Sequence, residues 1–296
     1  MTRAAKPMFL AAGHHGLRLV SPDGLTWSAP LLGKEGETYR CSAGGAGRLV
    51  AIGSFGGSNI FASTADGSTW KTSIKDAQYA RYIRGLGFGL DLFLALGGDP
   101  GSVGLARPFV FTSPDGETWT GPHDIPGKFM IRRLAFGNKR FVAVGDRGRR
   151  AASTDGKTWT DAPEVKAIDT LVDVAYGNGV FVGVGLNGLR MLTTDGVKWM
   201  DRRTGDEGEH LNSVMWAKDR FVAIGTGATW FSADGVKWER SANTNAPQAA
   251  THGAGVFVGS SWKGRLLRST DAIRWTEALK AEHHIETVAF AEVQTH

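Results

Sequence analysis

The 296-residue sequence predicts an all-β protein, a seven-bladed β-propeller whose blades are four-stranded antiparallel sheets. Three observations predict it. A short Asp-Gly-Trp motif occurs seven times at spacings of 37 to 49 residues, and β-rich repeats of about 40 residues are typical of propellers. Each repeat contains strand-sized segments, and the end of the chain supplies the strand that the first repeat lacks. The whole chain, residues 1–296, is therefore expected to form a single domain.

The repeated motif is clearest at Ser153–Trp159, which reads hydroxyl, spacer, Asp, Gly, two spacers and Trp. The Asp carboxylate can accept hydrogen bonds from the backbone N–H groups that follow it, and the Gly supplies the positive φ that such a turn requires. The Trp opens the next strand with a large surface to bury between sheets. In the seventh copy Ala272 replaces the Gly, which predicts a strained or differently shaped turn. The seven copies end at Trp27, Trp70, Trp119, Trp159, Trp199, Trp238 and Trp275.

Four strand-sized segments recur, and the fourth repeat shows them most clearly. Its strands are expected over 131–137, 141–145 and 151–153 and from Trp159 onward. Aromatic and β-branched residues, alternating patterns and Gly or Asn punctuation favour strands over helices. The second strand of each repeat is expected over 9–13, 49–53, 93–97, 141–145, 181–185, 221–225 and 257–261.

The two ends of the chain complete each other. The first repeat has no first strand, whereas the tail Ile285–Ala291 has the pattern of a first strand without a second. We expect the tail to pair with Phe9–Gly13 and close the ring, which removes two exposed sheet edges. In such a meander the Asp-Gly turns lie on one face, the turn face. The connections from fourth to first strands, and from second to third strands, lie on the other, the loop face, where ligands are expected.

The pattern Ser/Thr-x-Asp-Gly-x-x-Trp resembles the Asp-box repeat of β-propellers, also called the bacterial neuraminidase repeat. That repeat occurs in sialidases, some xyloglucan-active glycosidases, sortilin-type receptors, photosystem assembly factors and several lectins. The usual box has one more residue between Asp and Gly. Every copy here lacks it, which is similar to a shortened variant of bacterial propellers. The resemblance implies a propeller with its ligand site on the loop face, over the central channel.

Composition narrows the classes of function. The single cysteine, Cys41, excludes an intramolecular disulfide and a multi-cysteine metal site. The net charge of +5 favours anionic partners, but the basic residues lack the interleaved aromatic stripe of single-strand nucleic-acid binding. No apolar run approaches the ~20 residues of a membrane span. No signal peptide is visible in Met1–Pro7, which leaves the compartment open with the cytoplasm as default, and a monomer is expected.

A polar column is expected near the start of the first strands, at the mouth of the central channel. Aligning the repeats places three arginines at one level on consecutive blades, and we call Arg40, Arg84 and Arg132 the arginine arc. Planar guanidinium donors in this arrangement suit carboxylate, sulfate or phosphate groups. The alternative is that the arginines pair with nearby acids and only line a wet channel. This column and the next contain the other polar candidates, Arg133, Asp173, Asn212 and Glu286.

Aromatic and histidine side chains are further candidates. Trp230 and Trp262 follow second strands near the loop face, where an exposed indole could stack on a sugar ring; the alternative for each is a structural position. His14–His15 and His283–His284 should approach each other on this face, but adjacent histidines lack the spacing of a tight site, so no metal is expected. No phosphate-binding Gly loop precedes a helix, and no cofactor is expected.

The leading hypothesis is a non-catalytic propeller that binds an anionic or glycan-bearing partner through the arginine arc, with Trp230 and Trp262 as flanks. The first alternative is a carbohydrate-active enzyme that resembles sialidases, which use a Tyr nucleophile, a Glu that polarises it and an Asp acid. The second alternative is a protein-binding assembly factor, by analogy with the photosystem factors. Residues of the types that the first alternative requires lie at similar depth, namely Tyr39, Tyr82, Asp173 and Glu286.

Overall fold

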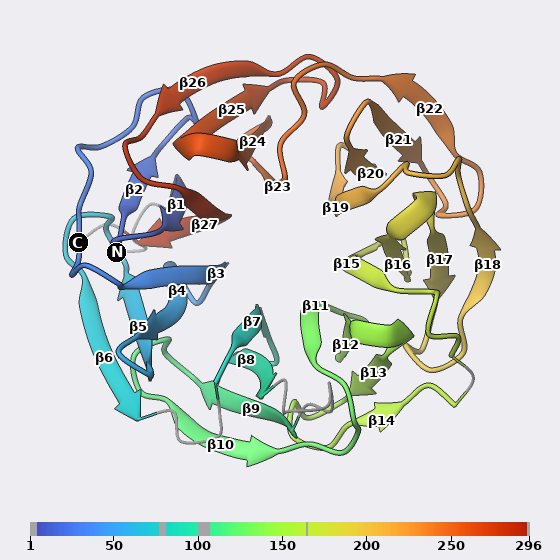
Figure 1. Ribbon diagram of the computed structural model, residues 1–296, viewed down its shortest axis with the longest axis horizontal. Coiled ribbons are helices and arrows are strands. Elements are labelled where there is room, and N and C mark those ends of the chain that lie inside the picture. Colours follow the sequence, from blue (N-terminus) through green and yellow to red (C-terminus); the bar gives the residue numbers. More distant parts are fainter. Residues whose placement is uncertain (1–4, 77–80, 100–106, 164, 295–296) are drawn as a thin grey trace.

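Seven antiparallel sheets stand in a ring, with the first strand of each sheet nearest the central axis (Figure 1). The computed structural model describes residues 5–76, 81–99, 107–163 and 165–294. This arrangement confirms the seven-bladed propeller. Six sheets have four strands, and the sheet of the first blade has three.

The strands follow the repeats in order. The first blade consists of β27 (Ile285–Gln294), β1 (Ala5–Gly13) and β2 (Arg18–Ser21). The second is β3 (Thr38–Gly45), β4 (Arg48–Phe55), β5 (Ser58–Thr64) and β6 (Lys71–Asp76). The third is β7 (Ile83–Gly89), β8 (Leu92–Asp99), β9 (Arg107–Ser113) and β10 (Thr120–Asp124). The fourth is β11 (Ile131–Gly137), β12 (Arg140–Gly145), β13 (Arg150–Ser153) and β14 (Thr160–Asp161).

The remaining blades are built in the same way. The fifth is β15 (Leu171–Gly177), β16 (Val180–Gly185), β17 (Arg190–Thr193) and β18 (Met200–Arg203). The sixth is β19 (Leu211–Ala217), β20 (Arg220–Gly225), β21 (Ala228–Ser232) and β22 (Glu239–Ala242). The seventh is β23 (Ala249–Gly253), β24 (Val256–Ser261), β25 (Arg265–Ser269) and β26 (Thr276–Lys280). Short 3-10 turns join second to third strands at η1 (Asp146–Gly148), η2 (Leu186–Gly188) and η3 (Trp262–Gly264).

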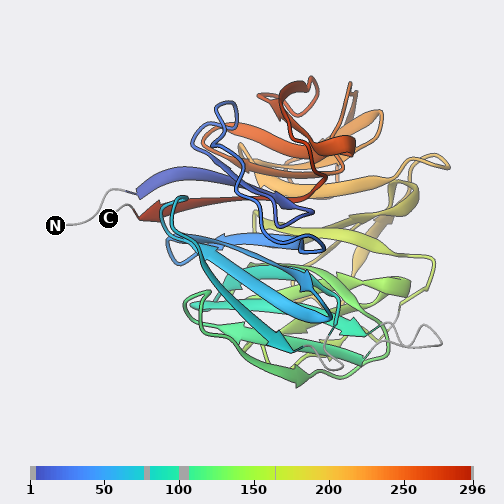
Figure 2. The same cartoon turned by 60° about the vertical axis from the view of Figure 1, so that its left-hand side comes forward.

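The ring closes where β27 pairs with β1, as expected from the two chain ends (Figure 2). The pairing is antiparallel and extends from Ala5 opposite Gln294 to Gly13 opposite Ile285. In the first blade the fourth strand is reduced to one bridge, in which the backbones of Arg18 and Leu31 exchange two hydrogen bonds. Pro30, which has no N–H to donate, limits further pairing of this segment.

The core lies between neighbouring blades. Six of the second strands have an almost fully buried phenylalanine at the equivalent position, where the second blade has Leu49, and each phenylalanine packs on an aromatic ring of its own first strand. That ring also lies on the last glycine of the preceding blade's first strand: a Cβ at Gly137 would overlap the ring of Tyr176. These glycines therefore allow neighbouring blades to approach closely. Trp216 and His252 occupy the same aromatic column and contact Phe221 and Phe257.

The Asp-Gly turns have the predicted hydrogen bonds. Asp155 Oδ1 accepts the backbone N–H groups of Lys157 and Thr158, each at 2.7 Å, and the Ser153 hydroxyl accepts the N–H of Gly156 at 2.8 Å. In five copies the Trp Nε1–H also donates to the carbonyl of the turn glycine or alanine. Ala272 keeps the same hydrogen bonds at a φ of 60°, so its turn is not differently shaped, and the left-handed backbone is where the expected strain lies.

Three buried or nearly buried arginines join blades in a way that the sequence did not indicate. Each is the first residue of a third strand and places its guanidinium over the turn Trp of the next blade. The distances to the ring centroids are 5.1 Å for Arg18 and Trp70, 5.4 Å for Arg150 and Trp199, and 5.7 Å for Arg190 and Trp238. Cation–π contacts of this kind supplement the apolar core between blades.

Candidate functional site

The polar column begins with a β-bulge in six of the seven first strands. In each, one extra residue interrupts the pairing with the second strand, for example between Tyr39 and Cys41. A bulge changes the direction of the side chain it carries, and all six bulged side chains are half-buried rather than packed in the core. β23 has no such interruption. The bulged residues are Arg40, Arg84, Arg132, Val172, Asn212 and Glu286.

The three members of the arginine arc differ in their partners. Arg132 is neutralised by Asp146, which accepts hydrogen bonds from both Nε and Nη2. Arg40 Nη1 lies 3.9 Å from Glu286 Oε1, the outer limit of an ion pair. Within the described part of the chain, the guanidinium of Arg84 makes neither a hydrogen bond nor an ion pair. Burial lowers the pKa of Arg84, and the positive charges of Arg40 and Arg132 lower it further. These causes destabilise the cationic guanidinium, and a bound anion would stabilise it.

Arg133 and Asp173, which follow the bulge in the fourth and fifth blades, have structural roles that the sequence did not show. Arg133 Nη1 donates to the carbonyls of Arg84 at 2.7 Å and Arg132 at 3.0 Å, which links the third and fourth blades. Asp173 Oδ1 accepts the N–H of Val174 at 2.9 Å, and its Oδ2 accepts the N–H of Val214 in the sixth blade at 2.8 Å.

Two further links continue this second column. Ser42 and Thr287 join their hydroxyls at 2.7 Å, and Ser213 accepts the N–H of Ala250 at 3.2 Å. These hydrogen bonds connect neighbouring blades around the axis. The groups of Arg133 and Asp173 named above therefore hydrogen-bond to neighbouring blades. Burial raises the pKa of Asp173 to about 6, although the charge of Arg133 opposes this shift.

The two candidate tryptophans are placed differently. Trp230 lies in β21 with the Arg190 guanidinium 3.8 Å from its ring centroid, and its Nε1–H donates to Glu209 at 2.9 Å. It is therefore packed between blades and is not an open aromatic flank, because the neighbouring blade covers it. Trp262 is 64% exposed at η3 and stacks on His284, with a centroid distance of 5.8 Å.

The two histidine pairs meet on the loop face, as expected. His15 stacks on His283 at 4.2 Å, and His14 meets His284 edge-on at 5.2 Å between ring centroids. Among the described residues, no group of three or more His, Cys, Asp or Glu side chains is arranged to hold a metal ion.

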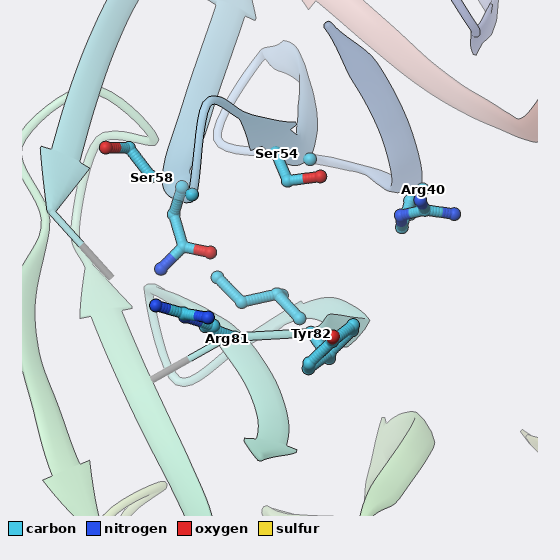
Figure 3. A pocket seen from close by; sticks show the side chains of 9 residues that line it. Arg40, Ser54, Ser58, Arg81 and Tyr82 are labelled. Carbon is cyan, nitrogen blue, oxygen red and sulfur yellow. The ribbon is translucent and has the colours of Figure 1, made fainter. Parts of the chain in front are cut away.

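A cavity opens beside the arginine arc, between the second and third blades (Figure 3). It lies between the β4–β5 hairpin and the residues that lead into β7, and Arg40 forms one side. Sequence alignment did not find it, because the hairpin and the lead-in segment differ from blade to blade. Residues of the cavity that the polar column does not contain include Ser54, Ser58, Arg81 and Tyr82.

The arrangement offers little for glycosidase chemistry. Tyr39 is fully buried, and burial raises the pKa of its phenol well above the usual range, the opposite of what a nucleophile needs. Tyr82 is 44% exposed, but Asp173 and Glu286 are engaged with backbone N–H groups and with His14 respectively.

No helix within the described ranges has the length and apolar character to cross a bilayer.

No protein-family model matches the chain, and no curated protein matches its sequence significantly. Solved structures share its fold. The structure of YCF48 bound to D1 peptide has 17% identity and a TM-score of 0.57, with 82% of each chain covered. YCF48 from Cyanidioschyzon merolae has 12% identity and a TM-score of 0.57, covering 90% of this chain and 93% of its own. The WD40 β-propeller domain of Doa1 has 10% identity and a TM-score of 0.64, with 85% of each chain covered.

Proposed function

We propose that this protein is a non-catalytic binding propeller that engages an anionic segment of a protein partner on its loop face. The observation that carries the proposal is Arg84, a half-buried guanidinium without a hydrogen-bonding partner in the described part of the chain. Arg40 lies beside it with only a distant ion pair to Glu286. Two guanidinium groups against one carboxylate favour a carboxylate or similar anion.

The choice of a protein partner is supported by the fold likeness to a propeller whose structure contains a bound peptide. That likeness extends to the fold and to no particular residue. Six Asp-Gly turns and the equivalent turn at Asp271-Ala272 support membership of the shortened Asp-box propellers, whose repeats build the scaffold and leave recognition to the loop face.

The test measures binding of a fluorescein-labelled peptide rich in Asp and Glu by fluorescence anisotropy. Arg84→Gln removes the unpartnered charge and is expected to weaken binding about tenfold or more, in keeping with a charge-assisted hydrogen bond. Lys157→Gln is the matched control, because it removes one exposed charge from the turn face. Binding of the peptide that is equal in the wild type and both variants would contradict the proposal.

A glycan is the second candidate, and Trp262 is the observation that favours it. Its exposed indole, stacked on His284, provides an aromatic face of the kind that binds sugar rings. A glycan array distinguishes the two candidates: neutral sugar binding that Trp262→Ala abolishes and Arg84→Gln leaves unchanged would favour the glycan.

A further inference from the structure

Trp262 occupies a position that faces the polar column in two other blades. It is the first residue after a second strand and is followed by two residues with positive φ. His14 in the first blade and Asp146 in the fourth precede the same backbone pattern. Each of these two side chains contacts the bulged residue of its own blade, Glu286 for His14 and Arg132 for Asp146. The equivalent position places Trp262 at the rim of the channel mouth.

The indole of Trp262 contacts the next blade and stays largely open to solvent. Its ring lies nearly parallel to that of His284 in the first blade, with an angle of 17° between the planes. The side chain is 64% exposed, whereas the turn tryptophans Trp159 and Trp275 are 5% and 4% exposed. Among the described residues, none accepts a hydrogen bond from its Nε1–H. The structure therefore does not use most of this apolar surface for packing.

The segment that carries Trp262 is held in place by the backbone. The Ala281 N–H donates to the carbonyl of Gly264, the last residue of η3, at 2.8 Å. A Cβ at Gly264 would overlap the carbonyl oxygens of Ala281 and His283, so η3 lies directly against the segment that enters β27. An aromatic side chain on such a fixed turn loses little conformational entropy when it binds a partner.

Four successive contacts lead from this indole to the arginine arc. The Trp262 ring lies on His284, which meets His14 edge-on at 5.2 Å between centroids. Nε2 of His14 lies 2.9 Å from Oε1 of Glu286, and the same oxygen lies 3.9 Å from Nη1 of Arg40. None of these contacts is longer than 5.8 Å. An extended peptide rises roughly 3.3 Å per residue, so about six residues can reach from one end to the other.

The surroundings of Trp262 favour a neutral ring as its partner. The next residue, Lys263, is exposed and would repel a second cation placed over the indole. A carboxylate is repelled by the negative face of the indole ring. An aromatic side chain avoids both costs and gains from offset-stacked or edge-on contact with the indole.

We propose that Trp262 binds an aromatic side chain of the same acidic segment that contacts Arg84, at most about six residues from its carboxylates. The inference rests on the proposed function, because it assigns a second contact of that partner. A segment with Tyr, Phe or Trp near its Asp and Glu residues is then preferred over one that carries negative charge alone. Exposed aromatic anchors of this kind commonly supply the selectivity of a protein interface.

Fluorescence anisotropy tests the contact with labelled peptides that carry Tyr two, four or six residues before an Asp-Glu-Asp sequence. Each has a counterpart with Ser in place of Tyr. We expect at least one Tyr peptide to bind the wild type about two- to tenfold more tightly than its Ser counterpart, the range for an aromatic pair. Trp262→Ala should remove this advantage and leave the Ser peptides unchanged, and Trp262→Phe should retain part of it.

Leu186→Ala is the matched control. Leu186 is an exposed apolar residue at the equivalent position of η2, so its loss should leave the Tyr advantage intact. Thermal denaturation establishes that each variant is folded. Equal affinity of every Tyr peptide and its Ser counterpart overturns the inference, as does an advantage that persists in Trp262→Ala. Equal affinity together with neutral sugar binding that Trp262→Ala abolishes assigns the indole to a glycan.

The Ser peptides test the proposed function separately. Arg84→Gln should weaken them and Trp262→Ala should not, because they lack the aromatic side chain. If Arg84→Gln weakens them and the Tyr advantage is missing, the inference fails and the proposed function stands. If Arg84→Gln leaves them unchanged, the proposed function fails, and the inference fails with it.

Discussion

The Nε2 atom of His14 lies 2.9 Å from Oε1 of Glu286, across the junction where the last strand closes the ring. The same carboxylate oxygen lies 3.9 Å from Nη1 of Arg40. Burial works to raise the pKa of Glu286, but the hydrogen bond from His14 and the nearby charges of His284, His14 and Arg40 lower it overall. Glu286 therefore stays ionised and is shared between an imidazole and a guanidinium.

This sharing predicts that His14→Ala weakens binding of the acidic peptide. Without the imidazole, Glu286 keeps Arg40 as its partner and holds that guanidinium away from the ligand. The loss of one charged contact is expected to change affinity about three- to tenfold at low salt. Fluorescence anisotropy provides the measurement.

The control is another histidine of the same cluster. His283→Ala should weaken binding less than His14→Ala does, because His283 stacks on His15, whereas His14 makes the hydrogen bond to Glu286. An equal loss of affinity in the two variants would show that His14 does not govern the site.

Asp155→Ala is expected to destabilise the fold by about 1–2 kcal/mol at pH 7, by analogy with the loss of a helix-capping carboxylate. Burial opposes it, but the backbone hydrogen bonds from Thr158 and Lys157 hold the pKa of Asp155 at about 2. A lowered folded pKa gives stability that is present above the ordinary value near 3.8 and is lost as pH falls through about 2. Urea denaturation between pH 7 and pH 2 should show the difference shrinking, whereas Lys157→Ala should change little.

Asp173→Asn should remove a pH dependence of the folding stability that has the opposite sign to that of Asp155. The pKa of Asp173 is raised to about 6, so its ionisation costs the folded state stability as pH rises from about 4 to above 6. Asn can accept only one of the two backbone hydrogen bonds, which lowers stability by a constant amount. Denaturation curves from pH 4 to pH 7 should give a sloping wild-type-minus-variant difference, and a flat difference would refute the assignment.

Gly137→Ala should cost about 1–3 kcal/mol, because the added methyl group overlaps the ring of Tyr176 in the next blade. Gly179→Ala is the informative comparison. No described atom lies within 4 Å of its Cβ position, but its φ is 81°, so only backbone strain of about 1 kcal/mol is expected. In a double-mutant cycle, Tyr176→Ala should recover part of the Gly137→Ala loss and none of the Gly179→Ala loss.

The scaffold could be predicted from the sequence because the repeated motif shows which residues of different blades are equivalent. The expected pairing of the tail Ile285–Ala291 with Phe9–Gly13 is confirmed, and Phe290 lies opposite Phe9. The level of the arginine arc follows from the same alignment. The partners of its members do not, because Asp146 lies in a connection whose path the repeat leaves open.

The surroundings of two other candidates could not be predicted for a related reason. Trp230 is covered by Arg190 from the neighbouring blade, and Asp173 binds the N–H of Val214 one blade away. An alignment of repeats shows what each blade contains. It does not show how the side chains of two adjacent blades meet, and the ligand-binding assignments depended on that.

The pairing of β1 with β27 also fixes how the molecule responds to a pull. Ala5 lies opposite Gln294, so the first and last described residues meet at the same end of the β1–β27 pair. A force that pulls these two ends apart therefore breaks the hydrogen bonds between β1 and β27 one after another. It does not load many of these bonds at the same time. Pulling on the two ends would therefore separate β1 from β27 and open the ring at low force, while the other six blades stay folded.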